Sequence, residues 1–334
     1  MNQHLVKDRK RMVLLYTGLA LASIVLALVS FGVGYYKMGI GEVFRVVFGQ
    51  SEDANGWIVL GIRLPRILAA YLIGAALSVS GAAYQGVLKN PLVSSDILGV
   101  ASGAGLGAAI AIMLRLNTVF IQVFALTGGI AAVALTYTLA RSVRFDRRVG
   151  LILSGVIVGS LAFAVTTTLK YAADTADQLP EITYWLMGSL SKVDLNALLI
   201  SLPFMAVGFA LMFAMRWRIN VLTLSDAEAA AMGVNVRAST LAVIAGATML
   251  SAAAVCLGGL IGWVGLMIPH ISRAVAGPQY SRLLPVSAML GGVFLLAMDD
   301  IVRSAAAMEF PIGLAVAFIG APFFFILIRR EGRI

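Results

Sequence analysis

Long apolar segments alternate with short polar breaks along almost the whole chain. Crossing about 30 Å of hydrocarbon takes roughly 20 residues of helix, and backbone in lipid must satisfy its hydrogen bonds internally. The pattern therefore predicts an all-α polytopic membrane protein with about ten transmembrane helices. The apolar segments are residues 13–34, 64–84, 93–114, 118–140, 149–169, 194–215, 239–258, 261–276, 283–301 and 311–329.

The composition agrees with lipid as the main solvent. Of the 334 residues, 60% are hydrophobic and 12% are charged, which leaves too little polar surface to cover a water-soluble fold. Residues 1–334 are predicted to form a single transmembrane domain, because no stretch is long and polar enough for a soluble module. The basic start of the chain is followed by an apolar stretch too long for a typical signal peptide, so we expect a retained first helix.

The distribution of charge predicts an orientation. The net charge is +9, but the Lys and Arg residues lie in the breaks between apolar segments and form no contiguous basic face, so nucleic acid is not the expected partner. With a cytoplasmic N-terminus, two thirds of the basic residues fall on the inner side, as the positive-inside rule requires. Both termini are therefore predicted to be cytoplasmic, with a tail at residues 1–12.

Three breaks are long enough to hold structure of their own. Residues 35–61 are predicted to lie outside and residues 216–238 inside, where soluble partners can reach them. The third break, residues 171–194, contains an aromatic stretch at residues 181–188. Tyr and Trp favour the headgroup region, so a short helix at the outer interface is predicted there.

Two arginines at the start of the second apolar segment, Arg63 and Arg66, run against the positive-inside bias. Pro65 between them suits the first turn of a helix, so both arginines are expected at its outer mouth. Cations there oppose the helix dipole by roughly 0.3–1 kcal/mol each, a cost that an acidic group outside would offset. Either the side chains extend to lipid phosphates or, as we favour, they dock an acidic surface of a soluble partner.

Two inner segments carry turn and capping signals. Gln85, Asn90 and Pro91 lie where the second helix ends, and Asn-Pro forces a break in the helix. In residues 224–233, Ser225 and Glu228 have the spacing of a capping box, the intervening alanines favour helix, and Gly233 suits a C-terminal cap. A short soluble helix is predicted there, which serves equally well as a grip for a cytoplasmic partner or as a structural connector.

The chain contains few of the Cys and His residues that bind metal ions or take part in nucleophilic catalysis. The single cysteine, Cys256, has no second thiol, and the only histidines are His4 and His270. No metal site and no cofactor are predicted. None of the lysines follows a glycine, so a Walker A loop is absent and this chain is not expected to be an ATPase or another enzyme.

Taken together, these segments resemble the FecCD-type permeases of binding-protein-dependent ABC importers, over nearly the whole chain. The residues that carry the resemblance are Arg63-Leu64-Pro65-Arg66, Ser80-Gly81 with Gln85, Asn90-Pro91-Leu92, Leu98-Gly99, Trp185 with Gly188-Ser189, Ala229 to Gly233, Gly265-Leu266 with Pro269-His270 and Arg273, Asp299 with Arg303, and Pro311-Ile312-Gly313 with Ala321-Pro322-Phe323-Phe324. Two departures stand out: Ser95 takes the place of a usual proline, and the stretch from Arg303 to Pro311 is one residue short.

The resemblance implies a type II ABC importer permease fold in a bacterial cytoplasmic membrane, with two copies or a pair of homologues around a translocation path. It implies that an outer binding protein docks on Arg63, Arg66 and Arg303, and that the region of Gln85, Asn90 and Pro91 is near an inner gate. The cargo is expected to be a metal chelate, a ferric siderophore first, with haem or cobalamin as alternatives. The residues expected to couple to a dimer of cytoplasmic ATPases are Ser225, Asp226, Glu228, Ala229, Ala230, Met232 and Gly233.

Two other classes of protein were weighed. An ion-coupled secondary transporter needs ionisable groups near the middle of the membrane, and only Asp299 and Asp300 depart from the rule that charges lie at segment ends. An intramembrane enzyme needs a nucleophile with its base or a metal set. The scarcity of His and Cys leaves an intramembrane enzyme few residues with which to build either.

Overall fold

The computed structural model describes residues 2–34, 39, 41, 45–46, 54–142, 146–305 and 310–331, and the regular elements within these residues are helices. The all-α prediction is confirmed. The elements are α1 (Asn2–Gly32), α3 (Ala54–Trp57), the π-helical η1 (Ile58–Arg63), α4 (Leu64–Val87), α5 (Val100–Met113), α6 (Thr118–Ser142), α7 (Arg147–Ala172), α8 (Gln178–Met187), α9 (Leu195–Leu222), α10 (Asp226–Ala231), α11 (Val236–Gly258), α12 (Val264–Ala276), α13 (Tyr280–Ala305) and α14 (Ile312–Glu331).

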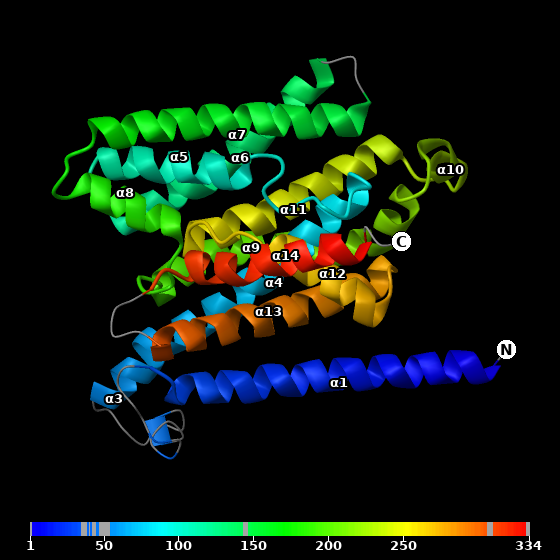
Figure 1. Ribbon diagram of the computed structural model, residues 1–334, viewed down its shortest axis with the longest axis horizontal. Helices are drawn as coiled ribbons and strands as arrows, with labels where there is room; N and C mark the ends of the chain where they lie inside the picture. Colours follow the sequence, from blue (N-terminus) through cyan, green and yellow to red (C-terminus); the bar gives the residue numbers. More distant parts are fainter. Residues whose placement is uncertain are drawn as a thin grey trace.

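The long helices lie side by side in one elongated bundle (Figure 1). Helix α7 runs along one edge and α1 along the opposite edge, with α4, α9 and α11 between them. Both termini and α10 lie at one end of the bundle, which we call the α10 end. Helices α3 and α8 and the start of α4 lie at the other, the α8 end.

Among the described residues, seven helices are long and apolar enough to cross a membrane: α1, α4 with η1, α6, α7, α9, α11 and α13. The shorter apolar helices α5, α12 and α14 complete the predicted set of ten apolar segments. The expected tail at residues 1–12 is part of α1 from Asn2 onward. Much of the break at residues 35–61 lies outside the described residues.

Two of the predicted spans begin later than expected. Helix α5 starts at Val100, although the apolar segment starts at residue 93, and α12 starts at Val264. At 14 and 13 residues, they extend about 20 Å each, less than the hydrocarbon thickness. Turns fill the segment before α5, since Asn90 Oδ1 accepts a hydrogen bond from the Leu92 N–H at 2.9 Å and Gly99 takes a left-handed φ of 84°.

The core is formed around α4 and α11, the two most buried spans. Backbone approaches backbone where glycines face one another. A Cβ on Gly81 of α4 would lie 1.8 Å from the Gly265 carbonyl oxygen of α12, and one on Gly74 would lie 2.1 Å from the Gly291 carbonyl oxygen of α13. Small residues thus allow α4 to pack tightly against both helices, as in other membrane bundles.

The predicted inner segment 216–238 is more helical than the sequence suggested. Helix α9 continues to Leu222 and α11 begins at Val236. Only a short connection remains between them, and it contains α10. Helix α8 confirms the short helix expected around residues 181–188, although it begins at Gln178.

Candidate functional sites

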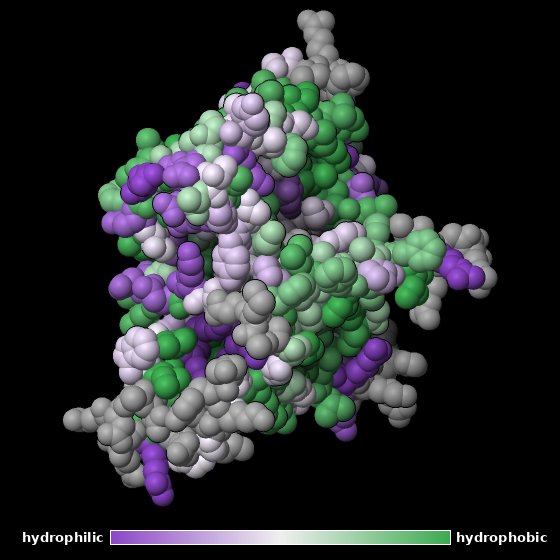
Figure 2. Space-filling model, turned by 60° about the vertical axis from the view of Figure 1, so that its left-hand side comes forward, coloured by the Kyte–Doolittle hydropathy of each residue, from purple (hydrophilic) through white to green (hydrophobic). Residues whose placement is uncertain are grey.

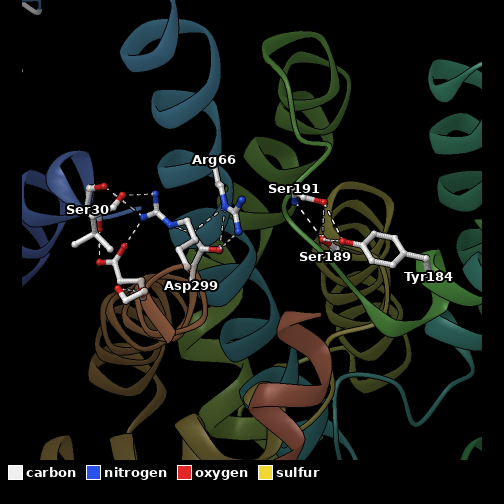
Figure 3. Close-up of polar contacts among 10 residues, drawn as sticks. Ser30, Arg66, Tyr184, Ser189, Ser191 and Asp299 are labelled. Carbon is white, nitrogen blue, oxygen red and sulfur yellow. Dashed lines mark hydrogen bonds and ion pairs between the residues drawn. The ribbon is translucent and has the colours of Figure 1, made fainter. Parts of the chain in front are cut away.

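Arg66 and Asp299 form a buried ion pair at the α8 end (Figure 3). The Arg66 Nε lies 3.1 Å from both carboxylate oxygens, and its Nη2 lies 2.9 Å from Oδ1. The Asp299 side chain is fully buried and that of Arg66 is 13% exposed. This bidentate geometry fixes the guanidinium plane as well as its position.

Arg303 joins the same carboxylate from one turn further along α13. Its Nε lies 3.0 Å from Asp299 Oδ2, and its Nη2 pairs with Asp300. The guanidinium also donates hydrogen bonds to the carbonyl oxygens of Val33 at 3.2 Å and Ser30 at 3.4 Å. Asp300 in turn accepts a hydrogen bond from Ser30 Oγ at 2.5 Å. Through these contacts the end of α1 is joined to α13.

Arg63 completes this group of charges, which we call the charged cluster: Arg63, Arg66, Asp299, Asp300 and Arg303. Arg63 is the last residue of η1, is 5% exposed, and donates a hydrogen bond to the carbonyl oxygen of Phe31. Its pairing with α1 makes the cluster a junction of α1, α4 and α13. Three positive and two negative side chains leave a net charge of +1.

The charged cluster changes the explanation for the unusual arginines. Their positions led us to expect an acidic group outside the chain, but for Arg66 a carboxylate of the chain itself, Asp299, offsets the cost. In the sequence, the spacings of Asp299 and Asp300 from Arg303, four and three residues along a helix, could have indicated these ion pairs. Docking of a partner on Arg63, Arg66 and Arg303 remains a prediction, and the shortened stretch before Pro311 falls partly outside the described residues.

A second polar group at the α8 end involves Tyr184, Ser189 and Ser191 (Figure 3). The Tyr184 hydroxyl lies 3.1 Å from Ser189 Oγ and 3.2 Å from Ser191 Oγ, and the two serine oxygens are 2.9 Å apart. These bonds fix the connection between α8 and α9. Figure 2, with this end turned forward, shows polar side chains gathered beside a broad apolar surface.

Gln85 connects the predicted gate region to α12. Its Nε2 donates hydrogen bonds to the carbonyl oxygens of Val93 at 3.0 Å and Gly265 at 3.4 Å, and the residue is 3% exposed. Asn90 and Pro91 form the turn that returns the chain to Val93. Gln85 therefore links the end of α4 to the start of α12, and a gate at Gln85, Asn90 and Pro91 remains a prediction.

Helix α10 has the caps that the sequence predicts. Ser225 Oγ accepts a hydrogen bond from the Glu228 N–H at 3.2 Å, and Glu228 Oε2 accepts one from the Ser225 N–H at 2.8 Å. At the other end, Gly233 has φ of 78°, and the Val234 N–H donates to the Ala229 carbonyl oxygen at 3.1 Å. The helix is thus closed at both ends by its own residues.

Only one side of α10 packs against the rest of the protein. Ala229 is buried against Val221 and Val234, whereas Ser225, Asp226, Glu228, Ala230, Met232 and Gly233 are exposed. The coupling residues predicted from the sequence therefore divide into one packing residue and six exposed residues, of which Ser225, Ala230 and Gly233 are small.

Two cations hold α10 to neighbouring helices, and the sequence did not indicate either. Asp226 pairs with Arg148 of α7 and lies 3.8 Å from Lys89 Nζ, just past the end of α4. The Lys89 ammonium also donates a hydrogen bond to the carbonyl oxygen of Leu224. These contacts would thus transmit a movement of α10 to α7 and to the end of α4.

No group of three or more His, Cys, Asp or Glu side chains that could hold a metal ion is found among the described residues. The charged cluster and α10 contain ion pairs and helix caps, and their described residues include no paired nucleophile and base. An all-helical bundle in which seven of the described helices are long and apolar enough to cross a membrane defines a multi-pass membrane protein.

The model of the FecCD transport family matches residues 21–330, and the chain belongs to this family. The molybdate import permease MolB of Haemophilus influenzae is 34% identical over 324 residues, covering 95% of each chain. The cobalamin import permease BtuC of Halobacterium salinarum is 39% identical over 308 residues, covering 91% of this chain and 82% of the relative.

A solved inward-facing transporter described as of the metal-chelate ABC type has the same fold. It superimposes with a TM-score of 0.84 at 34% identity, covering 96% of this chain and 99% of the other. The family resemblance inferred from the motifs is confirmed over nearly the whole chain.

Proposed function

We propose that the chain is the permease subunit of a binding-protein-dependent ABC importer for a metal chelate, with a ferric siderophore as the first candidate cargo. The family match over residues 21–330 carries this proposal, supported by the likeness to the metal-chelate ABC transporter. Haem and cobalamin are the alternative cargoes. The relatives differ in what their names say they import, so selection is assigned mainly to the binding protein.

Helix α10 is the proposed contact for a dimer of cytoplasmic ATPases. One face is exposed and includes small residues, its ends are capped, and Asp226 joins it to Arg148 and Lys89. When ATP closes the partner subunits, α10 would move with them and displace α4 and α7, which rocks the bundle between outward and inward access. This subunit contributes movement and performs no covalent step.

The α8 end is proposed to face outward from a bacterial cytoplasmic membrane, with both termini in the cytoplasm. The charged cluster lies there, and an outer binding protein would present acidic side chains to Arg63, Arg66 and Arg303. A second permease copy or a homologue would complete the translocation path.

The deciding test is ATP hydrolysis in nanodiscs that contain this subunit with the ATPase and binding protein encoded beside it. Ferric siderophores, haem, cobalamin and molybdate are each supplied with the binding protein. Hydrolysis that rises only with the loaded binding protein supports the importer and identifies the cargo. Failure to assemble with an ATPase, with uptake that collapses when the proton gradient is dissipated, would support an ion-coupled transporter instead.

A further inference from the structure

Two carboxylates pair with Arg66 and Arg303 in the charged cluster, and Asp299 is the partner that both share. It contacts Arg66 through Nε and Nη2 and Arg303 through Nε, at 2.9–3.1 Å. Two guanidinium groups of like charge are held close together only because a carboxylate lies between them. The relative placement of Arg66 and Arg303 therefore depends on Asp299.

Asp300 fixes Arg303 from the other side. It pairs with the guanidinium and accepts the hydroxyl hydrogen bond of Ser30 on α1. Arg303 is thus held between its own helix and the end of α1, whose Val33 carbonyl oxygen accepts a further hydrogen bond. The direction in which this guanidinium points is set by groups on two helices.

We propose that Asp299 and Asp300 are positioning residues for docking of the binding protein, holding Arg66 and Arg303 in the arrangement that the partner's carboxylates meet. This inference rests on the proposed function. The carboxylates do not contact the cargo and need not contact the partner. They act by fixing where the positive groups lie.

The free-energy cost of burying charged groups favours a positioning role for Asp299 and Asp300 over a purely stabilising one. Taking charged groups out of water is expensive, and a buried ion pair is often no more stabilising than well-packed apolar side chains of similar volume. Five charges gathered at one helix junction therefore suggest a requirement for fixed charge. An arginine already immobilised loses little rotamer freedom when a partner binds, so preordering favours affinity.

Because little of the Arg66 and Arg303 side chains is exposed, the orientation of their guanidinium groups matters for docking. The side chains of Arg66 and Arg303 are 13% and 9% exposed, so a partner can approach only their outer edges. A small rotation of either guanidinium would turn that edge away. Docking is therefore expected to depend on orientation more than on net charge.

The test compares Asp299→Asn with Asp174→Asn. Both changes remove one negative charge at the α8 end, but Asp174 belongs to an exposed pair, 3.7 Å from Arg115. The dissociation constant of the binding protein is measured on monodisperse protein in nanodiscs, at low and high salt. If net charge decides docking, both variants bind an acidic partner more tightly. If positioning decides it, Asp299→Asn weakens docking at least tenfold and Asp174→Asn does not weaken it.

Asp299→Glu keeps the charge and is expected to recover part of the affinity, which a merely structural loss would not predict. If Asp299→Asn does not fold, Asp300→Asn tests the inference instead, because Arg303 keeps its contact with Asp299 in that variant. Asp300→Asn is expected to weaken docking of the binding protein about threefold. Unchanged or tighter docking in the folded Asp299→Asn or Asp300→Asn variant overturns the inference while the proposed function stands. Absence of docking by the wild-type chain, with an active binding protein, rejects the proposed function and this inference with it.

Discussion

Single glycines set how closely the central helices approach. The carbonyl oxygen of Gly265 would lie only 1.8 Å from a Cβ on Gly81. The obstacle is backbone, which cannot rotate away as a side chain can. Hydropathy indicates that such glycines lie in helices, but it does not indicate which helix each one faces.

Gly81→Ala is expected to destabilise the protein, because α4 and α12 must separate to admit one methyl group. Overpacking of this kind costs about 1–3 kcal/mol, and the rigid neighbour places Gly81 toward the upper part of that range. The midpoint of thermal unfolding in detergent, followed by size exclusion, measures the loss. Gly262→Ala is the matched control, since no atom lies within 4 Å of its Cβ. Equal midpoints for the two variants would contradict the predicted contact.

At the scale of elements, α10 was the most predictable part of the chain. Its caps are local, so the spacing of Ser225 and Glu228 and the position of Gly233 were sufficient to predict it. Its attachment to Arg148 and Lys89 was not predictable, because those residues are remote in sequence and come together only when α4, α7 and α10 meet.

The capping box makes the start of α10 sensitive to acid. Hydrogen bonds from the Ser225 side chain, and then from its backbone N–H, hold the pKa of Glu228 below its usual value of 4.5. A lowered pKa means that this contribution to stability is present above pH 4.5 and is lost as the pH falls through the folded-state pKa. Hydrogen exchange of residues 225–233, corrected for intrinsic rates, is expected to show less protection at acid pH.

Glu228→Gln is the control for this prediction, since an amide oxygen can still accept the capping hydrogen bond but does not titrate. The variant is expected to lose the acid-dependent change in protection at α10. The same pH dependence in both proteins would assign the titration to another group.

Hydropathy alone does not predict where helices α5 and α12 begin. The apolar pattern continues through residues 93–99 and 261–263, yet these residues precede the helices. Pro91, a hydrogen bond from the Ala101 N–H to Asp96 Oδ1 at 2.6 Å and the left-handed φ of Trp263 accompany the delayed starts. In the segment before α5, Val93, Leu98 and Gly99 are buried by the protein, since lipid alone would not tolerate non-helical backbone.

The whole molecule has two chemically different ends, and the positive-inside rule predicts that the α10 end is cytoplasmic. Cysteine labelling tests this directly. The chain's own Cys256 is 2% exposed, whereas Met232 at the α10 end is 52% exposed and Tyr171 at the α8 end is 94% exposed. A single introduced thiol would thus report on one side of the membrane.

In spheroplasts, Tyr171→Cys is expected to react with a membrane-impermeant maleimide, and Met232→Cys only after permeabilisation. The parent chain, with Cys256 alone, serves as the unlabelled control. The reverse pattern would invert the orientation, and with it the proposed assignment of docking to the α8 end and ATPase coupling to the α10 end.

The sequence by itself determined the fold class, the approximate helices, the caps of α10 and the family. The fold class, the helices and the caps depend on local physics, since hydropathy, capping and proline act within a few residues, whereas the family rests on the resemblance of motifs along the chain. Only the tertiary structure decided that Asp299 pairs with Arg66 and Arg303, that α5 and α12 are short, and that Asp226 pairs with Arg148 of α7 and lies near Lys89 at the end of α4. These features depend on groups far apart in the chain, whose distances are set by helix packing.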